Sequence, residues 1–235
     1  MKRVLILGAS SDIGLEIVKY FQRAGWFVDC HGNSWRPEVV EEIGKLPNTE
    51  RFEADFSDIK EVEVAFAEDD RRNADTIINC VGLWESASFM DYSIEQMQRA
   101  YSVNVLAPFR IYRLCIPAMM NRCWGRIVNL GSIGVKFGGG AENFPYSLTK
   151  HSLELIPSEF KKWAVKSVFY NTVRVGVTDT RIHTQNPSKS MKDRVSLIPL
   201  GRMMRPEEIA ESVYWLGSEM NKVITGQVIS LSGGE

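Results

Sequence analysis

Tyr146 and Lys150 lie four residues apart in the stretch YSLTK, a spacing that places two side chains on one face of a helix. A tyrosine near its ordinary pKa of about 10 exchanges protons poorly at neutral pH. A neighbouring cation stabilises the phenolate and lowers that pKa. The pair therefore predicts a general acid and base, although exposed tyrosines and lysines without a catalytic role often share this spacing.

Ser132 follows RIVNLG, an apolar run typical of a buried strand. In an open α/β sheet, ligands bind beyond the carboxyl ends of the strands. A hydroxyl at that edge can hydrogen-bond a substrate oxygen and stabilise the charge that develops on it. Asn104 is a further polar candidate inside a predicted helix, where an ordinary structural role is the alternative.

A phosphate-binding turn is predicted directly behind the first apolar run, VLIL. Gly8 and Gly14, with Ser10 and Ser11 between them, connect this run to an amphipathic segment. Glycine lets the chain turn tightly and lets a diphosphate approach the backbone, while the start of the helix offers free N–H groups. A plain tight turn is the alternative, because such glycine patterns also occur without a ligand.

Asp12 stands where such a loop usually carries its middle glycine. Aspartate is a good helix N-cap, worth ~1 kcal/mol over alanine. An exposed anion beside a phosphate costs a similar amount in water-like surroundings. We therefore expect the Asp12 carboxylate to cap the helix and to turn away from the phosphate; the alternative is a loop that has lost its ligand.

The elements that must position these residues form an alternating pattern. Apolar runs that indicate strands are RVLIL, WFVDC, RFEAD, DTIINCV, GRIVNLG, SVFYNTVRV and QVISLS. Amphipathic segments between them indicate helices at 13–24, 37–46, 59–66, 94–121, 146–165 and 206–216. The alternation predicts one doubly wound, Rossmann-like α/β domain over 1–235, with helices on both faces of a mostly parallel seven-stranded sheet in the order 3-2-1-4-5-6-7.

Capping residues and prolines indicate where the helices begin and bend. Ser93 with Gln96 predicts a capping box at the start of the long helix. Pro108 and Pro117 fall inside that helix, and Pro157 falls inside the next one. Because the apolar pattern continues beyond each proline, we expect kinks rather than breaks.

Composition argues against several classes of protein. The 235 residues carry 28 Lys and Arg against 29 Asp and Glu, a net charge of −1 that gives no support for a nucleic-acid partner or an electrostatic membrane anchor. No apolar run approaches the ~20 residues that span a bilayer. The cysteines at 30, 80, 115 and 123 lack metal-ligand spacing, so we expect reduced thiols in a cytoplasmic protein and no metal site.

Several motifs occur in one order: GASSDIG at 8–14, NCVG at 79–82, NV at 104–105, GS at 131–132, YSLTK at 146–150 and GQVISLSGG at 226–234. This order resembles the classical short-chain dehydrogenase/reductase family over essentially the whole chain, including its 3-oxoacyl-carrier-protein reductases. The chain departs from the family's TGxxxGxG at Leu7 and Asp12, from NNAG at Cys80 and Val81, and from Pro-Gly at Val175.

The resemblance implies hydride transfer between a nicotinamide and a carbonyl carbon, with Tyr146 supplying the proton. It implies that Lys150 lowers the Tyr146 pKa and binds the nicotinamide ribose, that Ser132 polarises the substrate, and that Asn104 holds a water. The cofactor contacts that it implies are Gly8, Ser10, Ser11, Ile13, Gly14, Asn33, Ser34, Asp55, Phe56, Asn79, Gly82, Tyr146, Lys150, Gly176, Thr178 and Thr180.

The end of the second strand indicates which nicotinamide binds. An acidic residue there would bind the ribose 2′-hydroxyl and favour NAD(H). That position falls near Gly32, whereas Asp29 lies too early, within the strand. Asn33, Ser34 and Arg36 offer donors and a cation, which predicts NADP(H) over NAD(H). The alternatives are a solvated Arg36, or a register that returns Asp29 to the site.

The substrate is less well marked. Segment 178–200 is polar and aperiodic, which predicts a substrate lid; within it we expect His183 to be solvated rather than catalytic. Apolar pocket walls or core packing are predicted for Trp84, Phe89, Phe137 and Phe144. We expect three cations near the mouth of the substrate pocket: Arg122, Arg126 and Lys166. They could bind an acidic carrier protein or a phosphate; the alternative is that they are solvated surface charges.

We therefore expect a carbonyl or alcohol substrate, free or carried on a protein, and a homotetramer or homodimer. An NAD-dependent alcohol or sugar dehydrogenase of the same family is the alternative activity. A dinucleotide-binding sensor without chemistry would need a broken set of catalytic residues. A nucleotide-sugar epimerase would carry a larger C-terminal domain than the sequence leaves room for.

Overall fold

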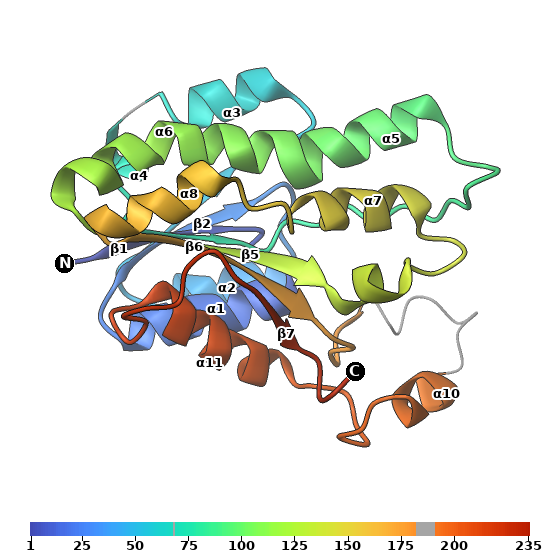
Figure 1. Ribbon diagram of the computed structural model, residues 1–235. Coiled ribbons are helices and arrows are strands. Elements are labelled where there is room, and N and C mark those ends of the chain that lie inside the picture. Colours follow the sequence, from blue (N-terminus) through green and yellow to red (C-terminus); the bar gives the residue numbers. More distant parts are fainter. Residues whose placement is uncertain (68, 182–190) are drawn as a thin grey trace.

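A computed structural model describes residues 1–67, 69–181 and 191–235 (Figure 1). It contains one seven-stranded sheet in the order β3-β2-β1-β4-β5-β6-β7, and every pairing is parallel. The strands are β1 (Arg3–Leu7), β2 (Phe27–Gly32), β3 (Thr49–Glu53), β4 (Thr76–Asn79), β5 (Gly125–Ser132), β6 (Val168–Val175) and β7 (Val228–Leu231). The predicted fold and strand order are confirmed.

Helices cover both faces of this sheet (Figure 1). One face carries α1 (Asp12–Arg23), α2 (Pro37–Gly44) and α11 (Pro206–Gly217). The other carries α3 (Ile59–Ala65), α4 (Asp69–Arg72), α5 (Ile94–Tyr101), α6 (Ala107–Arg122), α7 (Phe144–Ser152) and α8 (Ser158–Lys162). Shorter turns are η1 (Ser102–Leu106), η2 (Ile133–Phe137) and η3 (Trp163–Lys166), and α10 (Met191–Ser196) lies beside the sheet's carboxyl edge.

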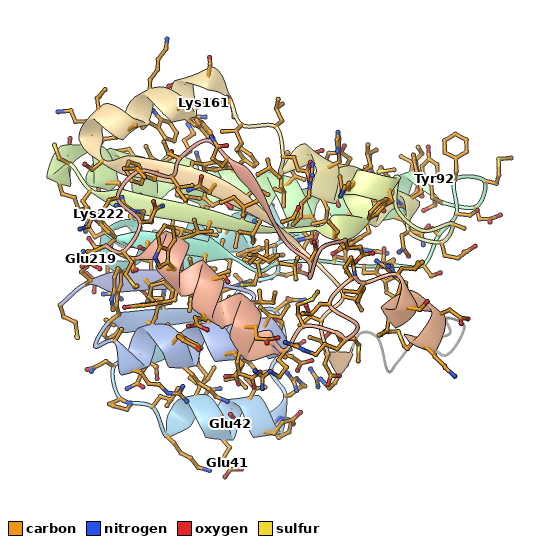
Figure 2. The ribbon with its side chains drawn as sticks, turned by 60° about the horizontal axis from the view of Figure 1, so that its bottom comes forward. Glu41, Glu42, Tyr92, Lys161, Glu219 and Lys222 are labelled. Carbon is orange, nitrogen blue, oxygen red and sulfur yellow. The ribbon has the colours of Figure 1, made fainter. Side chains whose placement is uncertain are left out.

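The central strands are apolar throughout because both of their faces are buried. In β1, Val4 and Ile6 pack into one core cluster, while Leu5 and Leu7 pack into the other, and all four are fully buried. Such two-sided burial explains a continuous apolar run where a half-exposed strand would alternate. Charged side chains lie outermost, such as Glu41 on α2 and Lys161 on α8 (Figure 2).

The helices differ from the prediction at one of the expected places. The segment expected as one long helix is helical throughout, as α5, the π-helical turn η1 and α6, and Pro108 stands in the first turn of α6, directly after η1. Pro117 does lie inside α6. The next helix ends at Ser152, and Pro157 is the N-cap of a separate helix instead of a kink.

The capping box at Ser93 is confirmed. Its hydroxyl accepts from the Gln96 N–H at 3.1 Å, and the Gln96 side chain accepts from the Ser93 N–H at 2.9 Å. In the part of the chain that the structure describes, none of the helices has the length and apolarity to cross a bilayer.

Candidate active site

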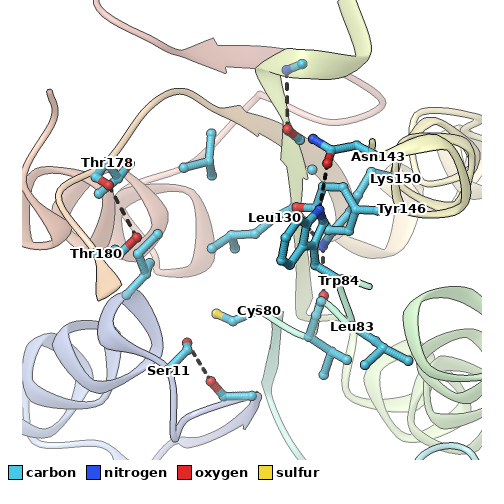
Figure 3. A pocket seen from close by; sticks show the side chains of 18 of the residues that line it. Ser11, Cys80, Leu83, Trp84, Leu130, Asn143, Tyr146, Lys150, Thr178 and Thr180 are labelled. Carbon is cyan, nitrogen blue, oxygen red and sulfur yellow. Dashed lines mark hydrogen bonds between the residues drawn. The ribbon is translucent and has the colours of Figure 1, made fainter. Parts of the chain in front are cut away.

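A cavity of about 1520 Å³ opens at the carboxyl ends of the strands. Figure 3 shows Tyr146, Lys150 and Trp84 on one side of it, with Ser11, Thr178 and Thr180 on the other. The predicted site residues that line it are Gly8, Ser10, Ser11, Ile13, Asn33, Ser34, Asp55, Phe56, Gly82, Ser132, Tyr146, Lys150, Gly176, Thr178 and Thr180. The lining leaves out three others, Gly14, Asn79 and Asn104.

Lys150 is held by two main-chain carbonyls. Its ammonium donates to Val81 O at 2.7 Å and to Leu130 O at 2.8 Å, at the ends of two neighbouring strands. The residue is 3% exposed, and this burial lowers the Lys150 pKa to about 8. Lys150 is therefore still mostly protonated at neutral pH, with its charge fixed beside the cavity.

Tyr146 lies one helical turn before Lys150, whose ammonium is 5.8 Å from the phenol ring centroid. Burial raises the Tyr146 pKa to about 12, and hydrogen bonding to Ser132 acts in the opposite direction. The prediction that the neighbouring cation lowers the Tyr146 pKa is thus wrong for the chain without a cofactor. The reason is that desolvation of the phenolate outweighs the stabilisation by its neighbours.

Asn104 lies on the π-helical turn η1 and is fully buried. Its side-chain oxygen accepts from Leu83 N at 2.6 Å, and its amide donates to Leu83 O at 3.0 Å and to the Thr149 hydroxyl at 2.9 Å. The Thr149 hydroxyl donates in turn to Tyr146 O at 2.8 Å. Asn104 therefore fastens the loop after β4 to the helix that carries Tyr146, and a water-holding role stays a prediction.

The glycine loop is closed by Ser11 and not by Asp12. The Ser11 hydroxyl accepts from Gly14 N at 3.0 Å, as the N-cap of α1, and donates to Gly8 O at 2.8 Å. Gly8 has φ of +80°, and a Cβ on Gly14 would lie 2.3 Å from Gly8 O. Both glycines are thus required by the backbone, and the loop has the tight shape that a diphosphate site needs.

Asp12 is the first residue of α1, and the predicted capping role is wrong. Its carboxylate instead accepts from Arg36 Nη2 at 2.8 Å and from the Arg181 N–H at 3.0 Å. Burial by itself would raise the Asp12 pKa, but hydrogen bonds and charge from Arg181, with the charge of Arg36, hold it below its ordinary value. The sequence pattern hides these partners, because one lies 24 and the other 169 residues away.

Asp29 lies within β2 and is not part of the cavity lining. It is fully buried and accepts from Arg3 Nε at 2.6 Å and Nη2 at 2.9 Å. The alternative register that would return Asp29 to the site is therefore wrong. Arg36 lines the cavity with Asn33 and Ser34 and is bound by Ser10 O, so it is no freely solvated charge.

His31 is a cavity residue that the sequence interpretation missed. Its Nδ1 accepts from Gly8 N at 3.2 Å, and its Nε2 lies 3.0 Å from Ala54 O, to which it donates. The ring stacks on Phe56 at 3.9 Å between centroids. Burial lowers the His31 pKa to about 4, so the ring is neutral at pH 7. The extension of β2 to Gly32, two residues past the predicted run, brings His31 here.

The predicted apolar wall is divided. Trp84 and Phe137 line the cavity, and the Trp84 indole donates to Asn143 Oδ1 at 2.8 Å. Phe89 and Phe144 instead pack edge to face outside the lining, at 5.0 Å. His183 and most of the predicted lid, 182–190, lie outside the described residues.

The cations expected at the substrate mouth lie at the wrong edge of the sheet. Arg126 stands near the start of β5 and is buried against the rings of Trp124 and Phe169. Arg122 pairs with Asp75, just before β4, and Lys166 precedes β6. The error has a simple cause: these residues lie before or at the start of strands, whereas the cavity lies where strands end. Over the described part of the chain, no cluster of three or more His, Cys, Asp or Glu could hold a metal ion.

Comparisons with known proteins identify relatives over nearly the whole chain. The family model described as Enoyl-(Acyl carrier protein) reductase matches residues 8–235. The chain is 30% identical over 238 residues to the 3-oxoacyl-[acyl-carrier-protein] reductase FabG of Aquifex aeolicus (strain VF5), covering 98% of this chain and 95% of that protein. It is 31% identical over 245 residues to an acetoacetyl-CoA reductase of Rhizobium meliloti (strain 1021), covering 100% and 99%.

A solved structure, ElxO with NADP bound, has the same fold, with a TM-score of 0.87 at 22% identity over 99% of this chain and 98% of that one. The chain belongs to the short-chain dehydrogenase/reductase family. Within that family it is similar to the 3-oxoacyl-carrier-protein reductases, and it is an NAD(P)-dependent oxidoreductase.

Proposed function

We propose that the protein transfers a hydride between NADP(H) and a carbonyl or alcohol substrate, using Ser132, Tyr146, Lys150 and Asn104. The observation that carries this proposal is one cavity that joins the Gly8 loop to the first three of these side chains. The glycine loop suits a dinucleotide, because the positive φ of Gly8 and the close approach of Gly14 to Gly8 O give it the tight turn of a diphosphate site. When bound, the nicotinamide supplies the hydride chemistry.

The side chains divide the remaining work. Tyr146 gives its phenolic proton to the substrate oxygen in reduction and recovers it in oxidation. Ser132 hydrogen-bonds the same oxygen and stabilises the charge that develops there. Lys150, fixed by Val81 O and Leu130 O, presents a cation near the phenol that favours its deprotonation in oxidation. Asn104 keeps the helix of Tyr146 in position.

The choice of NADP(H) over NAD(H) depends on the loop after β2. No acidic side chain from the end of β2 faces the cavity, while Arg36, Asn33 and Ser34 do. An arginine in this position suits a 2′-phosphate. Fold neighbours include ElxO, solved with NADP, and a 3-oxoacyl-[acyl-carrier protein] reductase from Brucella melitensis, solved with NAD, so the support for NADP(H) comes from Arg36, Asn33 and Ser34.

For the substrate, the names of the relatives support a 3-oxoacyl group, free or carried as a thioester. We also propose a single catalytic domain with a lid over 178–200, and assembly into a tetramer or dimer. The four cysteines are free, which supports a reducing, cytoplasmic compartment.

Fluorescence titration of the purified protein with NADPH and NADH tests the first step. We expect micromolar NADPH binding and weaker NADH binding, followed by NADPH-dependent reduction of acetoacetyl-CoA. Tight NADH binding with weak NADPH binding would overturn the cofactor choice. If neither dinucleotide binds, the proposed activity is wrong.

A further inference from the structure

Asp12 connects three parts of the chain at the rim of the cavity. Its Oδ1 accepts from Arg36 Nη2 at 2.8 Å, in the loop after β2. Its Oδ2 accepts from the Arg181 backbone N–H at 3.0 Å, and its Oδ1 accepts from Arg181 Nε at 3.1 Å. All three residues line the cavity. One carboxylate therefore lies between two guanidinium groups, beside the loop that we assign to the cofactor.

The hydrogen bonds of Arg36 are directed at protein acceptors. Besides Asp12, its Nη2 donates to Ser10 O at 3.0 Å, and its Nη1 donates to Glu38 Oε1 at 2.9 Å. Both N–H groups of Nη2 are thus occupied, so a phosphate that binds Arg36 through Nη2 displaces one of these two acceptors. Ser10 O is fixed in the glycine loop, whereas the Asp12 carboxylate can rotate away on its side chain. Carboxylate and phosphate bind a guanidinium in the same charge-assisted manner, so they compete directly.

Partial burial makes this competition stronger than it would be at an open surface. The side chains of Asp12 and Arg36 are 24% and 25% exposed. Interactions between charges weaken less in such surroundings than in bulk water. Asp12 also stays ionised at neutral pH, because its two arginine partners outweigh the effect of its burial. The competitor thus carries a full negative charge under working conditions.

We propose that Asp12 is a cofactor-specificity residue that competes with the 2′-phosphate of NADP(H) for Arg36. The inference rests on the proposed function, because it assumes that Arg36 faces the adenosine ribose. NAD(H) has no 2′-phosphate and does not need Arg36, so Asp12 leaves its affinity almost unchanged. Asp12 therefore narrows the preference that Arg36 creates and brings the affinities of the two cofactors closer together.

The test is the isosteric substitution Asp12→Asn, which removes the charge and keeps the shape. NADPH and NADH are titrated at one fixed ionic strength, and 2′,5′-ADP is compared with 5′-AMP by calorimetry. We expect the Kd for NADPH to fall at least about fivefold and that for NADH to change less than about twofold. Glu41→Gln is the matched control, since it removes the same charge from the exposed face of α2 (Figure 2) and changes neither Kd.

Repeating Asp12→Asn in an Arg36→Ala background isolates the pair. The gain for NADPH disappears there, because the Arg36 guanidinium for which Asp12 and the 2′-phosphate compete is gone. Asp12→Gly, which introduces the residue of the family pattern, must reproduce the gain if the asparagine variant folds poorly by circular dichroism.

Three results overturn the inference while leaving the proposed function standing, provided that the wild type binds a dinucleotide. They are an unchanged or weakened affinity of Asp12→Asn for NADPH, an equal gain for NADH, and a gain that persists without Arg36. Absence of binding of either dinucleotide by the wild type and every variant would instead remove the proposed function, and the inference with it.

Discussion

Lys150 and Arg36 are both cations that line the same cavity, but different forces hold them. Lys150 is 3% exposed and donates to Leu130 O in β5 and to Val81 O, two residues past β4. Arg36 is 25% exposed and binds the side chains of Asp12, at the start of α1, and of Glu38, in α2. A carbonyl fixed by the sheet cannot leave its donor without disturbing strands, whereas a carboxylate on a rotatable side chain can exchange for a ligand.

This difference indicates that the two ends of the cavity have different roles. The end with Lys150 and Tyr146 derives its geometry from the buried sheet, so it is rigid and suits chemistry that needs fixed distances. The end with Arg36 derives its geometry from partly exposed ion pairs, whose single substitutions have small structural consequences. We therefore expect changes at the rigid end to abolish the reaction, and changes at the ion-paired end to alter affinity and cofactor choice.

The largest effect is expected at the rigid end. Tyr146→Phe removes the proton donor and keeps the ring, so turnover falls by roughly 10²–10⁴-fold while the Kd for NADPH changes little. Steady-state rates and fluorescence titration measure the two quantities. Tyr101→Phe is the matched control, because its hydroxyl contacts Ser152 outside the cavity lining and its loss spares turnover. Retention of more than a few per cent of the rate in Tyr146→Phe would remove Tyr146 from the acid–base role.

A second effect concerns His31, which links the glycine loop to Phe56. Burial lowers the His31 pKa from 6.5 to about 4. Between these pH values His31 is protonated in the unfolded chain and neutral in the folded chain. The stability that His31 contributes is complete above pH 6.5 and is lost as pH falls to 4, by about 3 kcal/mol at most.

Urea unfolding of the wild type and of His31→Gln at pH 7.5 and 4.5 measures this loss. The free energy of unfolding of the variant should fall less on acidification than that of the wild type. His151→Gln controls for a histidine that lies exposed on α7 and should retain the wild-type dependence. Equal acid losses in wild type and His31→Gln would contradict the assigned burial.

A smaller effect is expected at the ion-paired end. Arg36→Ala should raise the Kd for NADPH about tenfold and leave the Kd for NADH unchanged, which corresponds to ~1.4 kcal/mol. Parallel titrations of both cofactors check this. Asn33→Ala should weaken NADPH binding in the same direction. Equal effects on the two cofactors would mean that these residues do not read the 2′-phosphate.

The same contrast explains which parts of the molecule could be predicted from the sequence. The strands, their order and the edge where Ser132 and Tyr146 meet follow from apolar runs and from the connection rules of parallel sheets. What was missed depends on contacts distant in sequence or on local competition between neighbours. Arg181 reaches Asp12 across 169 residues, and no periodicity reports such a pair.

Local competition caused the remaining errors. Pro157 was expected to kink a helix whose apolar pattern continues past it, but the chain begins a new helix there. The Tyr146 pKa was expected to follow the nearest cation, but burial has the larger effect. At the start of α1, Asp12 was expected as the cap, but the adjacent Ser11 occupies that position, which leads to the smallest prediction.

Ser11 and Asp12 are adjacent, and the structure gives them opposite roles: Ser11 caps α1, and Asp12 binds two arginines. Ser11→Ala should lower the free energy of unfolding by ~1 kcal/mol, because it leaves the Gly14 N–H without its acceptor. Ser10→Ala, one residue earlier, should cost less than about half of that. Denaturant unfolding at pH 7.5 compares them. A larger loss of stability in Asp12→Asn than in Ser11→Ala would mean that the ion pairs of Asp12, and not the Ser11 cap, hold the start of α1. The glycine loop would then resemble the ion-paired end of the cavity more than the rigid end.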